Sequence, residues 1–426
     1  MIKRIINSSL FQSAGIYTIT SGINAAIPFL LIPILTRYMS PGDYGIISMF
    51  GVLVSFVAPF TGLSIHGAIQ RQYYERDHID LPKYVSNCIL ILLTSSALVA
   101  TIFYIFGAPI SRISSFPQQW LWLVVIISIA QFLSQVVLVL WQVQVKPLPY
   151  GIYQILQTLL NATLSVWFVV GLGLAWKGRI EAQVIAVTVF GAVAIGILYK
   201  NKWLKFSFNR NYICNALRFG VPLIPHTLGG VIITMTDRFF ITNMVGLEST
   251  GLYTVGYQVG MIIGLLENAF TQAYAPWLFE RLKADDNAVK IKIVKLTYYY
   301  FLSIIAVAVV LGLIAPWLLS FFVGKQFSGS SNFVLWIALG YSFDGMYKMV
   351  VGYIFYVEKT YILAWITFLC AVINVILNYI LIKINGAIGA AQATTITFLL
   401  LFLLTWILSY HVYKMPWFQL KLKKVQ

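Results

Sequence analysis

Charged residues are scarce in this chain of 426 residues, because Asp, Glu, Lys and Arg together make up only 10% of it. A soluble globular chain carries about 25% charged residues and about 45–50% apolar ones. Here 60% of the residues are hydrophobic. The shortage of charge argues against a soluble enzyme, a nucleic-acid-binding protein, a disordered scaffold and a secreted disulfide-rich module. The composition is typical of a membrane protein.

Cysteine and histidine are also sparse. The three cysteines, Cys88, Cys214 and Cys370, are isolated and odd in number, so they predict neither a disulfide framework nor a zinc site. The four histidines are scattered in the same way. We therefore expect no metal centre and no cofactor.

Long apolar runs are abundant. No charged residue occurs between Lys83 and Arg112 or between Lys383 and Lys414, and a helix needs about 20 apolar residues to cross a bilayer. The connections between such runs are too short to fold as domains. The pattern predicts an all-α polytopic membrane protein with about twelve transmembrane helices. They cover roughly 11–36, 45–65, 84–107, 119–142, 150–174, 181–199, 219–245, 251–275, 294–319, 331–356, 360–382 and 386–412.

Basic residues predict the orientation of these helices. The chain has 29 Lys and Arg against 13 Asp and Glu, a net charge of +16. With twelve spans, 21 of the basic residues fall on the side that holds both termini and 6 on the other side. Because basic residues are retained in cytoplasmic loops, both termini are expected in the cytoplasm.

Two similar turns suggest an internal repeat. The first expected helix ends in Met39-Ser40-Pro41-Gly42-Asp43-Tyr44-Gly45, and the seventh ends in Met244-Val245-Gly246-Leu247-Glu248-Ser249-Thr250-Gly251. Each turn contains an acidic residue and closes on a Gly. The match favours two parallel-repeat lobes of six helices, residues 1–205 and 206–426, as in transporters built from parallel repeats.

Three groups of residues carry a resemblance that spans nearly the whole chain. They are Leu35-Thr36-Arg37-Tyr38-Met39-Ser40-Pro41 through Tyr44-Gly45; Leu217-Arg218-Phe219-Gly220-Val221-Pro222 through Pro225-His226, with Thr236-Asp237-Arg238-Phe239-Phe240-Ile241 and Gly251-Leu252-Tyr253; and Asn374, Asn378-Tyr379 and Gly386-Ala387-Ile388-Gly389-Ala390-Ala391. In this order and spacing, the sequence resembles the oligosaccharide and polysaccharide (O-antigen type) flippase family. That family belongs to the multidrug/oligosaccharidyl-lipid/polysaccharide exporter superfamily. The lipid II branch of the superfamily looks cationic along its first helix, whereas residues 12–36 here contain no charge.

The resemblance implies a transporter, not an enzyme. It implies a flippase that moves undecaprenyl-diphosphate-linked oligosaccharide repeat units across the bacterial inner membrane for O-antigen or capsule biosynthesis. It also implies a central cavity between the lobes. The expected partners are the lipid-linked oligosaccharide, the lipid bilayer and other polysaccharide assembly proteins, with no nucleic acid. A multidrug/cation antiporter of the same superfamily is the alternative, although the first half contains no acidic cluster for a cation. A membrane polysaccharide polymerase is a further alternative, which the short outer connections disfavour.

Charged residues inside the expected helices form the candidate site. Inserting a charged side chain at bilayer depth costs about 2.5–3.5 kcal/mol, so such a residue is expected to have a structural or functional role. Five occur, all in the second half: Asp237, Arg238, Glu267, Asp344 and Lys348. Lys348 follows Asp344 by four residues, so the two share a helix face and form either a structural ion pair or part of a substrate site.

Asp237, Arg238 and Glu267 have no oppositely charged residue four positions away on the same helix. Asp237 and Arg238 diverge by about 100° on a helix, so we expect them to face different partners. Glu267 has no partner within its own helix, and either a proton-coupled role or a neutral hydrogen-bonded one fits it. We expect Lys348 and Arg238 to offset the charge of a diphosphate.

Two neutral polar residues complete the candidate substrate-binding set. His226 precedes Asp237 by 11 residues, close to three helical turns, so both lie on one face. That face either lines a cavity or packs against another helix. Asn24 lies in the middle of the first expected helix, which also contains Pro28 and Pro33.

Overall fold

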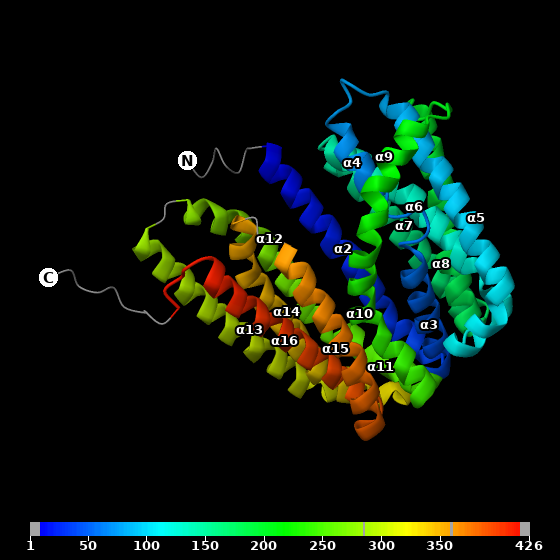
Figure 1. Cartoon of the computed structure of the whole chain (residues 1–426). Helices are drawn as coiled ribbons and strands as arrows, with labels where there is room; N and C mark the ends of the chain where they lie inside the picture. Colours follow the sequence, from blue (N-terminus) through cyan, green and yellow to red (C-terminus); the bar gives the residue numbers. More distant parts are fainter. Residues whose placement is uncertain (1–8, 284–285, 358–360, 418–426) are drawn as a thin grey trace. The chain divides into compact units, whose positions relative to one another are not determined.

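The computed structural model describes residues 9–283, 286–357 and 361–417, and every regular element in these ranges is a helix (Figure 1). The chain divides into two compact units, residues 1–231 and 232–426, which we call unit 1 and unit 2. The division falls inside the helix Ile224–Met244. It lies downstream of the boundary at 205/206 that the repeat suggests, and the six-helix lobes stay a prediction.

The helices of unit 1 follow the six apolar runs that the sequence predicts. They are α2 (Ser9–Tyr38), α3 (Pro41–Val57), α4 (His66–Tyr73), α5 (Leu81–Ser114), η1 (Gln118–Trp120), α6 (Trp122–Val143), α7 (Pro147–Val166), η2 (Trp167–Gly171), α8 (Ala175–Lys200), α9 (Arg210–Gly220), η3 (Val221–Leu223) and the start of α10 (Ile224–Met244). Two short helices, α4 and α9, form within connections that the sequence analysis left without regular structure. Asn209 begins α9 because its side chain accepts hydrogen bonds from the amides of Asn211 and Tyr212.

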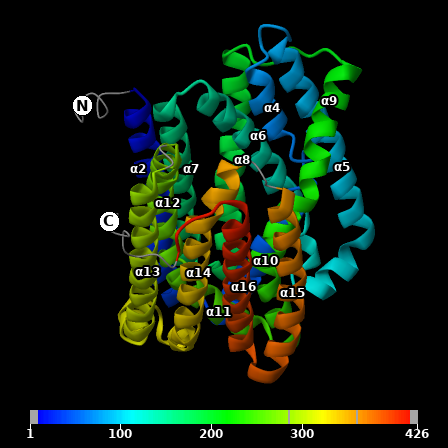
Figure 2. The same cartoon turned by 60° about the vertical axis from the view of Figure 1, so that its left-hand side comes forward.

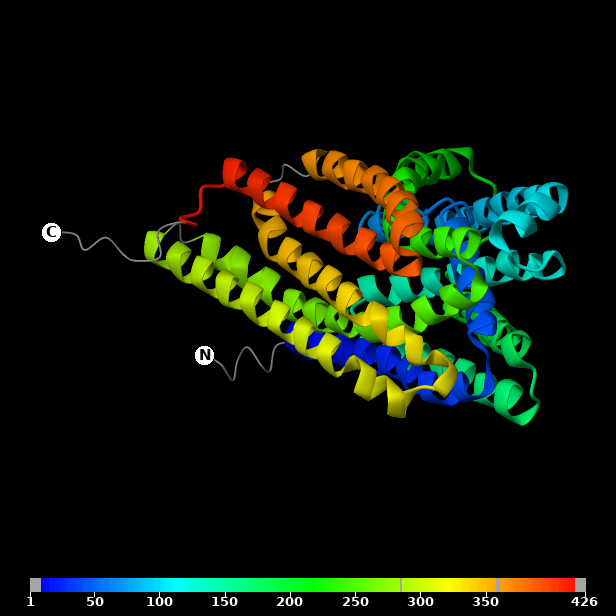
Figure 3. The same cartoon turned by 90° about the horizontal axis from the view of Figure 1, so that it is seen from below.

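Unit 2 is a bundle of long helices. It contains the rest of α10, α11 (Leu247–Gly260), α12 (Ile262–Leu282), α13 (Asn287–Phe322), η4 (Lys325–Ser330), α14 (Ser331–Tyr356), α15 (Tyr361–Asn385) and α16 (Ala387–Val412). Helices α13, α14, α16 and α15 pack side by side in that order (Figures 2 and 3). The single helix expected over 251–275 is two helices, α11 and α12, separated at Met261.

Eight helices of the described chain are long and apolar enough to cross a membrane, or nine if the bent pair Arg210–Leu223 and Thr227–Met244 counts as one span. The chain is therefore a multi-pass membrane protein, and each of the twelve predicted segments overlaps a helix. The segment expected over 45–65 is too long, because α3 ends at Val57 and a turn follows it. Helices α11, α12 and α14 fall outside the set of eight. These three carry most of the polar residues described in the next subsection.

The segment between α8 and α9 is held against the N-terminal end of α5. Asn87 donates a hydrogen bond to the carbonyl of Ser207 (2.8 Å) and accepts one from the amide of Asn209 (3.0 Å). The Lys205 ammonium lies 3.3 Å from the carboxylate of Asp80. Burial alone would raise the pKa of Asp80, but the backbone hydrogen bond from Lys83 and the hydrogen bond and charge of Lys205 lower it. These contacts hold the start of α9 against the N-terminal end of α5.

Three glycines let α11 and α12 approach α14 closely. Gly256, Gly260 and Gly264 are spaced four residues apart, so they lie on one face. An added Cβ would lie 2.4 Å from the Ser330 carbonyl at Gly256 and 2.7 Å from the side chain of Ile337 at Gly260. Small residues at this spacing allow membrane helices to pack backbone to backbone. The close approach brings side chains of α12 within reach of those of α14.

Candidate functional site

The first polar cluster of unit 2 surrounds Lys348, and we call Glu267, Asn268, Asp344 and Lys348 the Lys348 cluster. The Lys348 ammonium lies 2.8 Å from a Glu267 oxygen, 2.8 Å from an Asp344 oxygen and 2.9 Å from the Asn268 amide oxygen. Its three N–H donors therefore have three acceptors. The side chains of Lys348 and Asp344 are 22% and 16% exposed, whereas Glu267 is fully buried.

The pairing of Asp344 with Lys348 that their spacing predicts is present. Glu267, which has no partner on its own helix, takes its partner from α14 across the close α12–α14 contact. The cluster is thus a triad and not a pair. Two carboxylates and one ammonium carry a net charge of −1 when all three are ionised, and a proton on one carboxylate makes the cluster neutral.

The Lys348 cluster has hydrogen-bonding capacity that the described residues leave unused. The second oxygen of Glu267, Oε2, is buried and has no hydrogen-bond partner there, and the same holds for the hydroxyl of Tyr300. Both atoms lie over Gly345, where an added Cβ would be 2.7 Å from each. A buried polar atom without a partner is costly. The two atoms therefore form a polar site next to a partly exposed cation.

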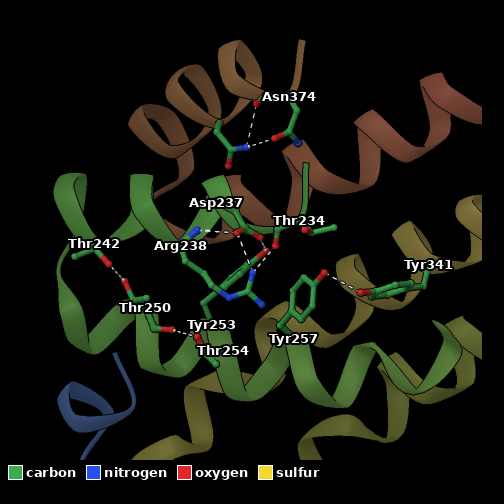
Figure 4. Close-up of polar contacts among 11 residues, drawn as sticks. Thr234, Asp237, Arg238, Thr242, Thr250, Tyr253, Thr254, Tyr257, Tyr341 and Asn374 are labelled. Atoms are coloured by element: carbon green, nitrogen blue, oxygen red, sulfur yellow. Dashed lines mark hydrogen bonds and ion pairs between the residues drawn. The ribbon is translucent and has the colours of Figure 1, made fainter. Parts of the chain in front are cut away.

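The second polar cluster surrounds Arg238, and we call Asp237, Arg238, Tyr253, Tyr257 and Tyr341 the Arg238 cluster (Figure 4). The guanidinium donates to the Asp237 carboxylate (3.0 Å) and to the carbonyl of Thr234 (2.7 Å). It also lies over the ring of Tyr257, 4.2 Å from the centroid. Asp237 and Arg238 are 0% and 6% exposed.

Hydrogen bonds close the Arg238 cluster on the remaining sides. Tyr253 donates to the second oxygen of Asp237, and the hydroxyls of Tyr257 and Tyr341 are 2.8 Å apart. The expectation that Asp237 and Arg238 face different partners is wrong. Their Cα–Cβ directions do diverge along the helix, but the long Arg238 side chain folds back along it and reaches its neighbour.

The two clusters lie along one face of α14. Tyr341, Asp344 and Lys348 are separated by three and four residues, the spacing of neighbours on a helix surface. Seven residues correspond to about 10 Å along the axis. All five charged residues that the sequence predicts inside helices therefore meet in two adjacent clusters within unit 2.

Asn24, a further predicted residue, does not join these clusters. Asn24 lies in unit 1, where it donates to Gln154 (3.1 Å) and accepts from Thr158 (2.9 Å), both on α7. These contacts link α2 to α7. His226 lies near the start of α10, and its side chain is outside the described residues.

Arg179 is one of the six basic residues that the twelve-span prediction puts on the side opposite the termini. It lies in the first turns of α8 and donates to Asn161 (2.8 Å) and Ser165 (3.0 Å) on α7. No ion pair of Arg179 with an acidic residue is present in the described part of the chain. The tyrosines around Arg238 were also missed. The four-residue spacing of Tyr253 and Tyr257 is a signal for a shared helix face, but it does not reveal which charge they contact.

The comparisons with known proteins show the family and the fold of the chain. The model of the family described as "Polysaccharide biosynthesis protein" matches residues 10–282. The chain belongs to this family. The match covers unit 1 from residue 10 onward and continues through α10, α11 and α12, so it includes α10 and α11 of the Arg238 cluster and also Glu267.

Two relatives of this family member are similar over most of their length. An "Uncharacterized membrane protein" of Haemophilus influenzae is 27% identical over 92% of this chain and 92% of its own. The "Capsular polysaccharide biosynthesis protein CapF" of Staphylococcus aureus is 22% identical over 74% of this chain and 77% of its own.

Solved structures share the fold of this family member. The lipid II flippase MurJ in an inward closed conformation is similar with a TM-score of 0.74 and 16% identity, over 93% of this chain and 87% of that one. An inward-facing multidrug resistance MATE family transporter of the MOP superfamily is similar with a TM-score of 0.63 and 17% identity, over 94% and 92%. At these identities the likeness shows the fold alone.

Proposed function

We propose that this protein is a flippase that moves undecaprenyl-diphosphate-linked oligosaccharide repeat units across the bacterial inner membrane for surface polysaccharide biosynthesis, O-antigen or capsule. It has no covalent catalytic step. Both termini lie in the cytoplasm, as the bias of 21 basic residues against 6 favours. The observation that carries the proposal is the family match over residues 10–282.

The Lys348 cluster is the part of unit 2 best suited to meet the anionic head of such a substrate. Lys348 is partly exposed, and its two carboxylate partners hold it in place without burying it. When a proton binds Glu267, the ammonium loses one ionic partner and attracts a phosphate oxygen more strongly. Arg238, by contrast, has its charge offset by Asp237 and serves unit 2 as an internal support.

The proposed transport cycle is alternating access. The lobes 1–205 and 206–426 move as rigid bodies, while the prenyl chain stays in lipid and the diphosphate and sugars pass through a polar cavity. Other polysaccharide assembly proteins then act on the repeat unit at the outer face.

A multidrug/cation antiporter is the second candidate, because Glu267 and Asp344 are two carboxylates on one cation. A metal or drug cation would have to displace Lys348 from both. The MATE transporter has the same fold, so fold does not separate the two functions. Deletion of the gene separates them, because it affects surface polysaccharide in one case and drug sensitivity in the other.

Deletion of the gene in its own host tests the proposal. We expect long surface polysaccharide to be lost while lipid-linked repeat units accumulate on the cytoplasmic face, measured by their protection from an impermeant enzyme in sealed right-side-out cells. Repeat units that reach the outer face unpolymerised would contradict the proposal and favour a polymerase. Normal polysaccharide with increased drug sensitivity would favour the antiporter.

A further inference from the structure

Unit 1 contains an apolar groove between α3, α5 and α9, with a volume of about 840 Å³. Among its lining residues only Thr94 and Ser95 are polar. The Thr94 hydroxyl donates to the carbonyl of Leu90, and the Ser95 hydroxyl donates to that of Leu92 and accepts from the amide of Gly62. The groove therefore offers no free polar group, and only an apolar occupant fits it.

The groove is long. Its lining on α5 extends from Leu90 to Phe103, about 20 Å at a rise of 1.5 Å per residue, and continues to Ile110 beyond the kink at Phe106. The hydrocarbon core of a bilayer is about 30 Å thick, and one acyl chain of a phospholipid reaches only its middle. The groove is therefore longer than one acyl chain, and a longer linear chain matches it.

One end of the groove is strongly basic. Phe208, Ile213 and Leu217 line this end, and residues 200–218 contain five basic residues and no acidic residue. The basic side chains are exposed: Lys200, Lys202, Lys205, Arg210 and Arg218. Contacts of α9 with α5 and α4 keep Arg210 and Arg218 beside the groove (Figure 1), and Lys205 is held by Asp80 at the start of α5. An apolar groove with a basic end is complementary to a lipid with a phosphorylated end and one long tail.

A strained turn forms part of the groove wall. Gly62, Leu63 and Ser64 are consecutive and all left-handed, with φ of 75°, 50° and 55°. Leu63 and Ser64 are not glycines, so this conformation costs free energy that other contacts must offset. The turn is fixed from its other side by Gly220, where an added Cβ would lie 2.3 Å from the Leu63 carbonyl oxygen. Strain of this kind is concentrated at ligand-binding and switching segments.

We propose that this groove, whose residues Leu90, Leu98 and Ile102 are exposed on the lipid-facing surface of unit 1, holds the polyprenyl chain of the lipid-linked substrate. The phosphates lie beside the basic residues of 200–218 before the head group passes to the Lys348 cluster. This inference rests on the proposed function and adds the subsite for the tail. The occupant is the polyprenyl chain and not a membrane phospholipid, because the groove is longer than one acyl chain and has the basic residues of 200–218 at one end, against Arg112 of α5 near the other.

The test uses the purified full-length protein in nanodiscs and two photoreactive lipids. One is undecaprenyl phosphate with a diazirine at the tail end, and the other is phosphatidylglycerol with a diazirine on an acyl chain. We expect the prenyl probe to label lining residues of α3 and α5. Unlabelled undecaprenyl phosphate should compete for this labelling, and excess phosphatidylglycerol should not. Equal labelling by both probes, or competition by phosphatidylglycerol, would overturn the inference.

A matched pair of variants locates the site. Leu98 lines the groove and is 63% exposed, whereas Leu93 lies outside it on the same helix and is 55% exposed. Leu98→Trp should lower prenyl labelling by about tenfold, and Leu93→Trp should leave it unchanged. Equal loss in both variants would contradict the groove as the site. If wild-type protein flips lipid-linked oligosaccharide but shows no selective labelling, the inference fails alone. If labelling is selective but the deletion strain exports polysaccharide normally, the proposed function fails instead.

Discussion

The Arg238 cluster and the Lys348 cluster lie about 10 Å apart along α14, yet they are built in opposite ways. Arg238 has one carboxylate, an aromatic ring beneath its guanidinium and almost no exposed surface. Lys348 has two carboxylates, a partly exposed side chain and two neighbouring polar atoms that have no hydrogen-bond partner in the described part of the chain, Glu267 Oε2 and the Tyr300 hydroxyl. The charged groups of the Arg238 cluster all have partners within the cluster, whereas the Lys348 cluster can still form hydrogen bonds to another group.

The difference shows that charge inside the membrane is not by itself a sign of a binding site. A buried pair whose donors and acceptors are all satisfied acts as a support, and removing one member is costly. A cation that is exposed, and whose partners are in excess, can exchange one of them for a ligand. The predictions that follow test whether this contrast holds.

The largest effect is expected for Arg238→Gln. The variant leaves the buried carboxylate of Asp237 without its cation, which should cost about 3–5 kcal/mol of stability. The amount of folded protein, measured by size-exclusion chromatography of a fluorescent fusion in detergent, should fall sharply. The double variant Asp237→Asn with Arg238→Gln should recover most of it. A well-folded single variant with poor transport would move Arg238 from the structural role to substrate binding.

Two tyrosine variants compare the clusters directly. Tyr253→Phe removes the hydroxyl that donates to Asp237, and losing a hydrogen bond to a charged group costs about 1.5–3 kcal/mol. Tyr300→Phe removes a hydroxyl that has no partner among the described residues, so its thermal midpoint should stay near that of the wild type. Thermal unfolding of both purified variants measures the difference. Equal midpoints would mean that the two clusters are satisfied to the same degree.

A glycine variant tests the space over Gly345. The added methyl of Gly345→Ala would lie 2.7 Å from Glu267 Oε2 and from the Tyr300 hydroxyl. Both atoms are ends of side chains that move aside, so we expect a stability loss near 1 kcal/mol and a clear loss of transport. Gly340→Ala on the same helix is the control, because its methyl would meet ordinary contacts at 3.4 Å or more. Unchanged transport in Gly345→Ala would show that this space is not used.

The smallest effect is expected for Asn268→Ala. Its amide is exposed and supplies one of the three acceptors of Lys348, and water replaces such an acceptor easily. Stability should change by less than about 1 kcal/mol. Thermal unfolding checks this value, and a loss comparable to that of Arg238→Gln would show that the Lys348 cluster is as closed as the Arg238 cluster.

Much of the fold could be predicted from the sequence, because apolar runs of spanning length report membrane helices directly. The short helices α4 and α9 were missed since they lie in polar connections, where caps such as Asn209 decide the structure. The pair Asp344 and Lys348 could be predicted from its spacing on one helix. The partner of Glu267 could not, because it depends on the close contact of α12 with α14 that Gly256, Gly260 and Gly264 permit.

The Asp237–Arg238 contact was predicted wrongly for a related reason. Helical geometry fixes where the Cβ atoms point, but a long guanidinium side chain reaches back along its own helix. The tyrosines that enclose it come from α11 and α14, and their contacts follow from tertiary packing that no local pattern contains.

Transport by two charge-free variants tests most directly the claim that the Lys348 cluster, and not the Arg238 cluster, receives the anionic head group. The first variant combines Glu267→Gln, Asp344→Asn and Lys348→Gln, and the second combines Asp237→Asn and Arg238→Gln. Each removes all the charges of its cluster and strands none. At equal amounts of folded protein in proteoliposomes, the first should transport lipid-linked oligosaccharide about tenfold more slowly than wild type, and the second at nearly the wild-type rate. Wild-type transport by the first variant would contradict the claim.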